Sequence, residues 1–102
     1  MIKSPERVWK SETAKQFAGA LTSISEVKDM QNFLRDAMTE KEIIEISSRL
    51  EAARLLKDGA RYIEVINKTQ LSSRTVARIS DWLQNGCGGY QKVLSPAHHT
   101  HL

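Results

Sequence analysis

One stretch, residues 61–83, constrains the fold more than any other part of this chain. Its apolar residues recur at the intervals of an α-helix in two short blocks, and a polar segment, residues 69–72, separates them. The single apolar residue of that segment, Leu71, is expected to fill the angle between the two helices. The pattern predicts two short helices joined by a tight turn, with these side chains facing inward: Ile63, Val65 and Ile66 on the first, and Val76, Ile79 and Leu83 on the second.

The outward face of the second helix carries a different kind of side chain. The helix is expected to begin near Ser72 or Ser73, whose hydroxyl can accept from the free amides of the first turn. Short polar groups and long hydrogen-bond donors follow, of the kind that read base edges and hold phosphates in a major groove: Ser72, Ser73, Arg74, Thr75, Ala77 and Arg78. We therefore interpret the stretch as a helix-turn-helix that binds double-stranded DNA.

The basic residues of this unit have different expected roles. Arg74 is the predicted base reader, because a guanidinium near the helix start can pair with guanine through two hydrogen bonds. Arg78 either contacts phosphate or stacks on Trp82, one turn later. Two residues that flank the first helix are expected to hold phosphates without specifying sequence: Lys68 and Arg61.

The charge distribution agrees with a nucleic-acid partner. Residues 1–48 hold seven Lys/Arg and eight Asp/Glu, whereas residues 49–102 hold eight Lys/Arg and four Asp/Glu. The excess of positive charge therefore accompanies the helix-turn-helix, which favours a polyanionic partner. A chain of 102 residues is expected to form one domain, too short for a multistep catalytic cleft.

The rest of the chain predicts an all-α fold. Apolar stripes predict helices over residues 11–21 and 26–37. A capping box, in which Thr39 and Glu42 bond to each other's amide groups, is expected to start a long helix over residues 40–57. The apolar arc of this helix is wider than one partner helix would cover, so we expect one side to pack on its own chain and another on a second chain.

The domain organisation follows from these elements. We expect residues 1–10 to form an N-terminal arm or a first helical turn. Residues 11–94 are expected to form the helical DNA-binding domain, and residues 95–102 a disordered tail. The three histidines of that tail lack the fixed geometry that a metal site requires, so we expect no metal there.

Other classes of function find little support. No stretch approaches the roughly 20 apolar residues of a membrane-spanning helix. Cys87 is the only cysteine, so no disulfide can form within the chain, and we expect a cytoplasmic protein with an incidental thiol. The sequence shows no nucleophile–base pair, phosphate-binding loop or metal-ligand spacing, so we expect neither an enzyme nor a bound cofactor.

Residues 39–94 resemble the Trp repressor superfamily, and in particular its YerC/YecD branch of small bacterial proteins. The resemblance is carried by residues 38–50, by the LLKDG turn at residues 55–59, by the two-helix unit and, most distinctively, by WLQNGCGGY at residues 82–90. It implies an all-α fold, an intertwined homodimer in which the N-terminal helices of two chains interlock, and DNA-binding transcriptional regulation.

The resemblance also implies a ligand pocket. In the Trp repressor two arginines hold the tryptophan corepressor. Arg49 and Arg78 match those positions, and Thr39 matches a residue that lines the same pocket. Where the repressor has glycine after its second arginine, this chain has Ile79, whose branched side chain would fill the space of the indole ring. We therefore expect that free tryptophan does not control this protein and that any small-molecule effector is a different compound.

Two further departures concern the general helix-turn-helix pattern. Ile66 stands where alanine usually lets the helices approach, and Gln70 stands where glycine usually makes the turn, so we expect more widely splayed helices. The leading interpretation is a sequence-specific DNA-binding transcriptional regulator, with repression as the expected effect. The alternative is a dimeric helical interaction module that has lost operator binding. DNA affinity that falls steeply with salt would distinguish the two.

Overall fold

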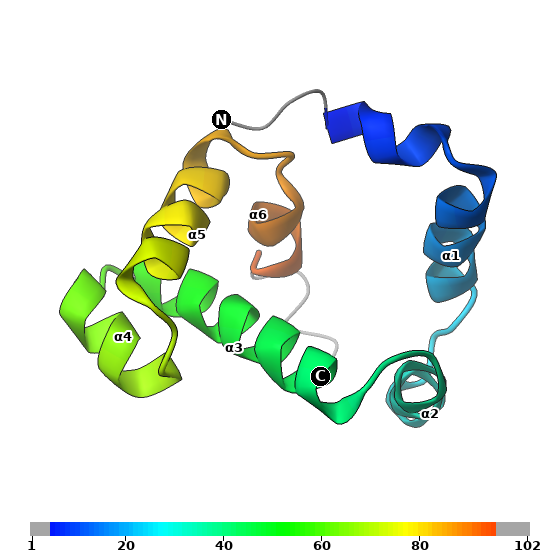
Figure 1. Cartoon of the computed structure of the whole chain (residues 1–102), viewed down its shortest axis with the longest axis horizontal. Helices are drawn as coiled ribbons and strands as arrows, with labels where there is room; N and C mark the ends of the chain where they lie inside the picture. The colour runs from blue at the N-terminus through cyan, green and yellow to red at the C-terminus, as the bar shows by residue number, and fades with distance from the viewer. Residues whose placement is uncertain (1–4, 96–102) are drawn as a thin grey trace. The chain divides into compact units, whose positions relative to one another are not determined.

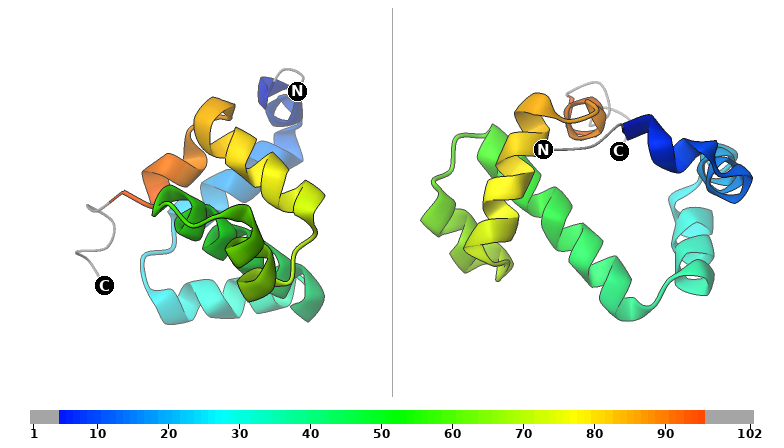
Figure 2. Two further views of the ribbon diagram at one scale, coloured as in Figure 1. Left: turned by 90° about the vertical axis from the view of Figure 1, so that its left-hand side faces the viewer. Right: turned by 45° about the horizontal axis from the view of Figure 1, so that its top comes forward.

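The structure, a computed structural model, describes residues 5–95 (Figure 1 and Figure 2). The regular elements of these residues are all helical, as predicted: η1 (Pro5–Lys10), α1 (Glu12–Thr22), α2 (Val27–Ala37), α3 (Glu40–Lys57), α4 (Tyr62–Thr69), α5 (Ser73–Asn85) and α6 (Gly89–Val93). The chain divides into two compact units between Ile43 and Ile44, within α3.

The ends of the chain are described only in part. Pro5–Lys10 form a short 3-10 helix, which agrees with the predicted first helical turn. Residues 1–4 and 96–102 lie outside the described residues, and with them the predictions of a disordered tail and of a tail that binds no metal.

Side-chain caps set the starts of α1 and α3. The hydroxyl of Ser11 accepts from the amide of Ala14 at 3.3 Å, so α1 begins directly after Ser11. At the start of α3 the amide of Thr39 donates to the Glu42 carboxylate at 2.8 Å, and the amide of Glu42 donates to the Thr39 hydroxyl at 3.1 Å. The predicted capping box is confirmed. The hydrogen bond from the Thr39 amide holds the pKa of Glu42 below its ordinary value of 4.5.

The first unit contains no core of its own. None of residues 6–43 is buried. The rings of Phe17 in α1 and Phe33 in α2 lie 6.3 Å apart, yet Phe17 keeps 44% of its surface exposed and Val27 keeps 65%. The apolar stripes of α1 and α2 are therefore only partly covered, with most of their residues half-buried and none buried.

The second unit packs around the C-terminal half of α3. Ala52 and Ala53 are fully buried there, and α4 and α5 lie at this end of the helix (Figure 1 and Figure 2). α4 contacts α5, and α5 contacts α6. Leu71 packs against the core from the turn, as predicted. The buried cluster contains residues of α3, α4 and α5, together with Leu94, which directly follows α6. Its members are Ala52, Ala53, Leu55, Val65, Val76, Ile79, Leu83 and Leu94.

The predicted inward faces of α4 and α5 are correct except at one position. Val65, Val76, Ile79 and Leu83 are buried, and Ile66 is half-buried against the same core. Ile63, however, is 58% exposed. It precedes Val65 by two residues, which places it about 200° away around the helix, on the opposite side from the core.

The turn between α4 and α5 is made by a residue in a left-handed conformation. Gln70 has φ 63° and ψ 16°, the region that glycine adopts without strain. Its amide donates to the carbonyl of Ile66 at 2.8 Å, and its side chain donates to the carbonyl of Asn67 at 2.7 Å. Gln70 thus makes the turn that glycine usually makes, at a cost in backbone strain.

We expect Gln70→Gly to be more stable than Gln70→Ala. A left-handed conformation costs a residue with a Cβ about 1–2 kcal/mol, and the greater freedom of glycine in the unfolded chain returns about 0.5–1 kcal/mol of this. Both Gln70→Gly and Gln70→Ala lose the side-chain bond to Asn67, so the free energy of unfolding of the glycine variant should exceed that of the alanine variant by about 0.5–1 kcal/mol, measured by urea denaturation at one fixed protein concentration. Gln70→Ala is the control: it keeps the strain, loses the bond to Asn67 and should give no gain. A glycine variant less stable than the alanine variant would contradict the assignment of strain to Gln70.

Candidate nucleic-acid interface

Two hydroxyl groups fix the start of α5. The Ser72 hydroxyl accepts from the amide of Thr75 at 3.1 Å and lies 3.0 Å from the Thr75 hydroxyl. Of the two predicted capping residues, Ser72 and Ser73, Ser72 is therefore the cap of α5. Thr75 was predicted on the outward face, but it is only half-exposed and its hydroxyl bonds to the cap, so it presents less to a partner than expected.

The first turn of α5 also differs from those of the preceding α-helices in charge. The first turns of α1, α2, α3 and α4 each contain at least one carboxylate, whereas the first turn of α5 contains none. The cap itself is neutral. The positive end of the helix dipole is therefore not offset by a side-chain charge at this position, which favours an approaching anion.

The exposed face of α5 carries two arginines one turn apart. Arg74 and Arg78 are exposed, and neither makes a hydrogen bond or an ion pair with any described residue. Arg78 makes no ring contact either, so the predicted alternative of stacking on Trp82 is wrong for this structure. Trp82 instead packs partly against the core. Residues at intervals of three and four share a helix face, so Ser73 and Ala77 lie on the same side as these arginines.

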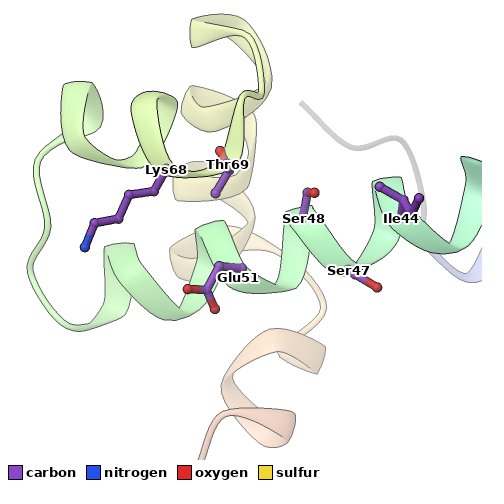
Figure 3. Close-up of a pocket in the computed structure, with 6 residues that line it drawn as sticks. All are labelled: Ile44, Ser47, Ser48, Glu51, Lys68 and Thr69. Carbon is purple, nitrogen blue, oxygen red and sulfur yellow. The ribbon is translucent and has the colours of Figure 1, made fainter.

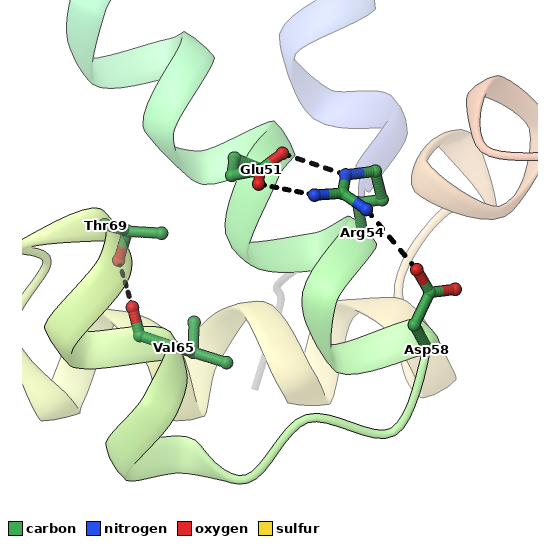
Figure 4. Close-up of polar contacts among 5 residues, drawn as sticks. All are labelled: Glu51, Arg54, Asp58, Val65 and Thr69. Atoms are coloured by element: carbon green, nitrogen blue, oxygen red, sulfur yellow. Dashed lines mark hydrogen bonds and ion pairs between the residues drawn. The ribbon is translucent and has the colours of Figure 1, made fainter.

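Arg54, on α3, is by contrast fully engaged. Its Nε and Nη2 atoms lie 2.9 Å and 2.5 Å from the two carboxylate oxygens of Glu51, and its Nη1 atom lies 3.4 Å from Asp58 (Figure 4). The hydrogen bond from Arg54 is the main reason that the pKa of Glu51 is lowered. A guanidinium held on both sides by carboxylates is not free to bind a phosphate.

Lys68 lies beside this pair. A shallow cavity of about 270 Å³ between α3 and α4 is lined by Ile44, Ser47, Ser48, Glu51, Lys68 and Thr69 (Figure 3). The charge of Lys68 contributes to the lowered pKa of Glu51, so the predicted phosphate anchor is partly balanced by a carboxylate of its own chain. The Thr69 hydroxyl donates to the carbonyl of Val65 at 2.7 Å and is thereby occupied (Figure 4).

Arg61, the other predicted phosphate anchor, precedes α4. Its amide donates to Glu64 at 3.0 Å, and this bond lowers the pKa of Glu64 from its ordinary value. Its guanidinium Nε atom is 3.7 Å from the same carboxylate, with the side chain 82% exposed. A pair so exposed contributes little, so the Arg61 side chain can leave Glu64 at small cost.

Two of the three residues of the predicted ligand pocket, Arg49 and Thr39, already bond to residues nearby in sequence. Arg49 Nη2 lies 2.8 Å from Glu45, and its Nε atom is buried with no partner. Tyr90 lies close enough for the charge of Arg49 to oppose the rise in its pKa that burial causes. Arg78 is exposed on α5, and Thr39 belongs to the first unit with its hydroxyl in the capping box. Ile79 is fully buried in the core.

Other candidate sites receive no support in the described part of the chain. Cys87 is exposed and unpaired. Residues 5–95 contain no cluster of three or more His, Cys, Asp or Glu side chains that could hold a metal. Nor does any described helix have both the length and the apolar character needed to cross a membrane.

Three features near the interface were not predicted. The pairs Glu51–Arg54 and Asp81–Asn85 have the three- and four-residue spacings of neighbours on a helix, so the sequence carried a signal for both. The approach of Tyr90 to Arg49 joins residues far apart in the chain, and no local pattern indicates it.

The geometry defines an all-α protein whose α4 and α5 form a helix-turn-helix with a capped and exposed second helix. The sequence profile of the Trp repressor protein family matches residues 12–98, which is most of the chain. The chain therefore belongs to this family, as the sequence resemblance implied.

Relatives agree with the assignment. The chain is 29% identical over 79 residues to YerC, an uncharacterized protein of Bacillus subtilis, an alignment that covers 78% of this chain and 76% of YerC. A TrpR-like protein from Eubacterium eligens has the same fold, with a TM-score of 0.82, 27% identity and 89% and 94% of the two chains covered. A candidate Trp repressor from Staphylococcus aureus gives a TM-score of 0.83 at 22% identity, with 93% and 95% covered, and shows the fold alone.

Proposed function

We propose that this protein is a sequence-specific DNA-binding transcriptional regulator that acts as a homodimer and inserts α5 into the major groove. The observation that carries the proposal is the pair of unpaired arginines on the exposed face of α5, Arg74 and Arg78. Within the second unit, the other three arginines each face a carboxylate.

The position of these arginines within α5 determines their roles. Arg74 lies in the first turn, the part of a recognition helix that reaches base edges, so it is the base reader. Arg78 lies one turn later and contacts phosphate. Lys68 and Arg61 are the further phosphate contacts. The contact of Lys68 is weakened, because the carboxylate of Glu51 partly offsets its charge. Ser73 adds a free hydroxyl at the start of the helix.

Dimerisation follows from uncovered apolar surface. None of residues 6–43 is buried, and the part of α3 in the second unit exposes Ile44 at 59%, Ile46 at 55% and Leu50 at 38%. Isolated exposed apolar residues are common, but partly covered stripes on several helices of so small a chain indicate a partner surface. We infer that a second copy covers them, so folding and association are coupled.

The ion pair of Arg49 also limits which small molecules could bind as an effector. A ligand carboxylate that approached Arg49 would have to displace Glu45, which already binds it at 2.8 Å. Ile79 cannot be removed to make room without opening a cavity in the core. We infer that tryptophan is not the effector and that any small-molecule effector has other chemistry.

The DNA-binding proposal is tested by binding-site selection followed by substitution. Arg74→Ala should cost about 1–3 kcal/mol on the selected site and remove the preference at one base position. Lys68→Ala should weaken all sequences nearly alike, with a smaller slope of affinity against salt. Arg54→Gln, which removes an equal charge from a paired arginine, is the control and should leave the base preference unchanged. An unchanged base preference in Arg74→Ala would refute the assignment of α5, and affinity independent of salt would favour an interaction module.

The assembly is tested by light scattering and thermal melting. We expect a dimer at submicromolar concentration and a melting temperature that rises with protein concentration, because unfolding and dissociation are one transition. Ile46→Glu, which places a charge on the exposed face of α3, should shift the equilibrium towards the monomer and lower the melting temperature. A well-folded wild-type monomer at all concentrations would count against the dimer.

The absence of tryptophan control is tested by calorimetric titration of the wild-type protein. Ile79 should fill the space that the indole ring of tryptophan would need. Such overpacking typically costs 1–3 kcal/mol, about one to two decades of affinity, so we expect no binding in the micromolar range. Glu45→Gln, which releases Arg49 from its ion pair, tests whether the arginine alone can recruit the amino acid. Micromolar binding by the wild type that also raises DNA affinity would refute the claim.

A further inference from the structure

A carboxylate without a cation lies on the same helix as the two free arginines. The second unit contains five acidic residues among its described residues, and four of them, Glu45, Glu51, Asp58 and Glu64, face an arginine. Asp81 alone has no ion-pair partner in this part of the chain. It accepts one hydrogen bond, from the side-chain amide of Asn85 at 2.9 Å, and is exposed.

Asp81 shares the exposed face of α5 with the proposed DNA contacts. It follows Ala77 by four residues and Arg74 by seven, the spacings that repeat along one helix face. Arg78 is three residues earlier, yet the two side chains form no ion pair. The bond from Asn85 ties the carboxylate to the residue one turn further along the helix, away from the first two turns.

The position of the charge affects different binding modes unequally. Residues 73–78 extend about 8 Å along the helix, which is two to three base pairs, and Asp81 lies a further turn along. When α5 enters the groove by its first two turns, Asp81 remains near the rim. When the helix lies along the backbone without reading bases, its third turn approaches phosphates, and an unpaired carboxylate is repelled by them.

We propose that Asp81 is a specificity-determining residue, whose unpaired carboxylate on the DNA-facing side of α5 weakens non-specific binding more than binding to the cognate site. The inference rests on the proposed DNA-binding function and adds to it that only the first two turns of α5 enter the groove. Asp81 does not read a base; it discourages the contacts that carry no sequence information.

The test is Asp81→Asn, which removes the charge and keeps an oxygen that can accept from Asn85. Affinities for the selected site and for a random-sequence duplex are measured at several salt concentrations. We expect non-specific affinity to rise about fivefold at low salt, from the loss of one repulsive charge, and specific affinity to rise less than about twofold. The specificity ratio should fall, and the difference should shrink as salt is raised.

Two controls separate this role from others. Asp58→Asn removes an exposed aspartate that is paired with Arg54, outside α5, and should leave the ratio unchanged. The Asp81 substitution is repeated in an Arg78→Ala background, where the fall in the ratio should persist. Its disappearance there would mean that Asp81 acts only by neutralising Arg78 in solution, which overturns the proposal. The melting temperature should not change, because Asp81 is exposed and its bond to Asn85 is retained.

The outcomes for the inference and for the proposed function are distinguishable. If Asp81→Asn raises both affinities equally, or neither, while the wild type still prefers its selected site, the role of Asp81 fails and the regulator remains. If the wild type selects no site and binds duplex DNA at no salt concentration, the proposed function fails and the role of Asp81 with it.

Discussion

The packing of α4 and α5 against two alanines of α3 is the contact on which the second unit depends. Ala52 and Ala53 are fully buried, and their small side chains leave space beside α3 for Val65, Val76 and Ile79, the largest fully buried side chains of the protein. Burial of each of these three contributes about 1.5–3 kcal/mol. A larger residue at either alanine would overpack this cluster, to which both α4 and α5 contribute, and so would disturb the helix that carries Arg74 and Arg78.

Ion pairs in the second unit divide its arginines into those bound to carboxylates of the chain and those free to bind a partner. Glu51 and Asp58 hold Arg54 in place, and Glu45 holds Arg49, so these arginines strengthen α3 and offer little to a partner. α5 has no such pairs. Its neutral cap, its first turn without acid and its two free arginines bring positive potential together at one end of one helix. The net charge of the whole chain, +3, does not reveal that positive charge is concentrated on α5.

Local signals in the sequence predicted most of the fold. The bounds of α3, the Thr39–Glu42 capping box and the start of α5 were predictable because helix periodicity and caps depend on residues close together in the chain. Ile63 was not, since which side of a short helix is buried depends on what packs against it. The same holds for the candidate site: Arg74 and Arg78 could be chosen from their place in α5. The sequence does not show that Arg54 and Arg49 form ion pairs with carboxylates, or that the charge of Lys68 is partly offset by Glu51. These contacts depend on neighbours that only the folded chain defines.

Side-chain caps of two chemical kinds stabilise the starts of α3, α4 and α5, and the difference determines how each start responds to acid. The first turns of α3 and α4 hold carboxylates, Glu42 and Glu64, which accept from the amides of Thr39 and Arg61, and these hydrogen bonds lower the pKa of each carboxylate. Such a group stabilises the fold above its ordinary pKa of 4.5, and the stabilisation is lost as the pH falls through the lowered value. α5 begins at the Ser72 hydroxyl, which does not titrate in this range. Acidification therefore loosens the carboxylate half of the α3 capping box and the start of α4, while the hydroxyl caps at Thr39 and Ser72 keep their hydrogen bonds.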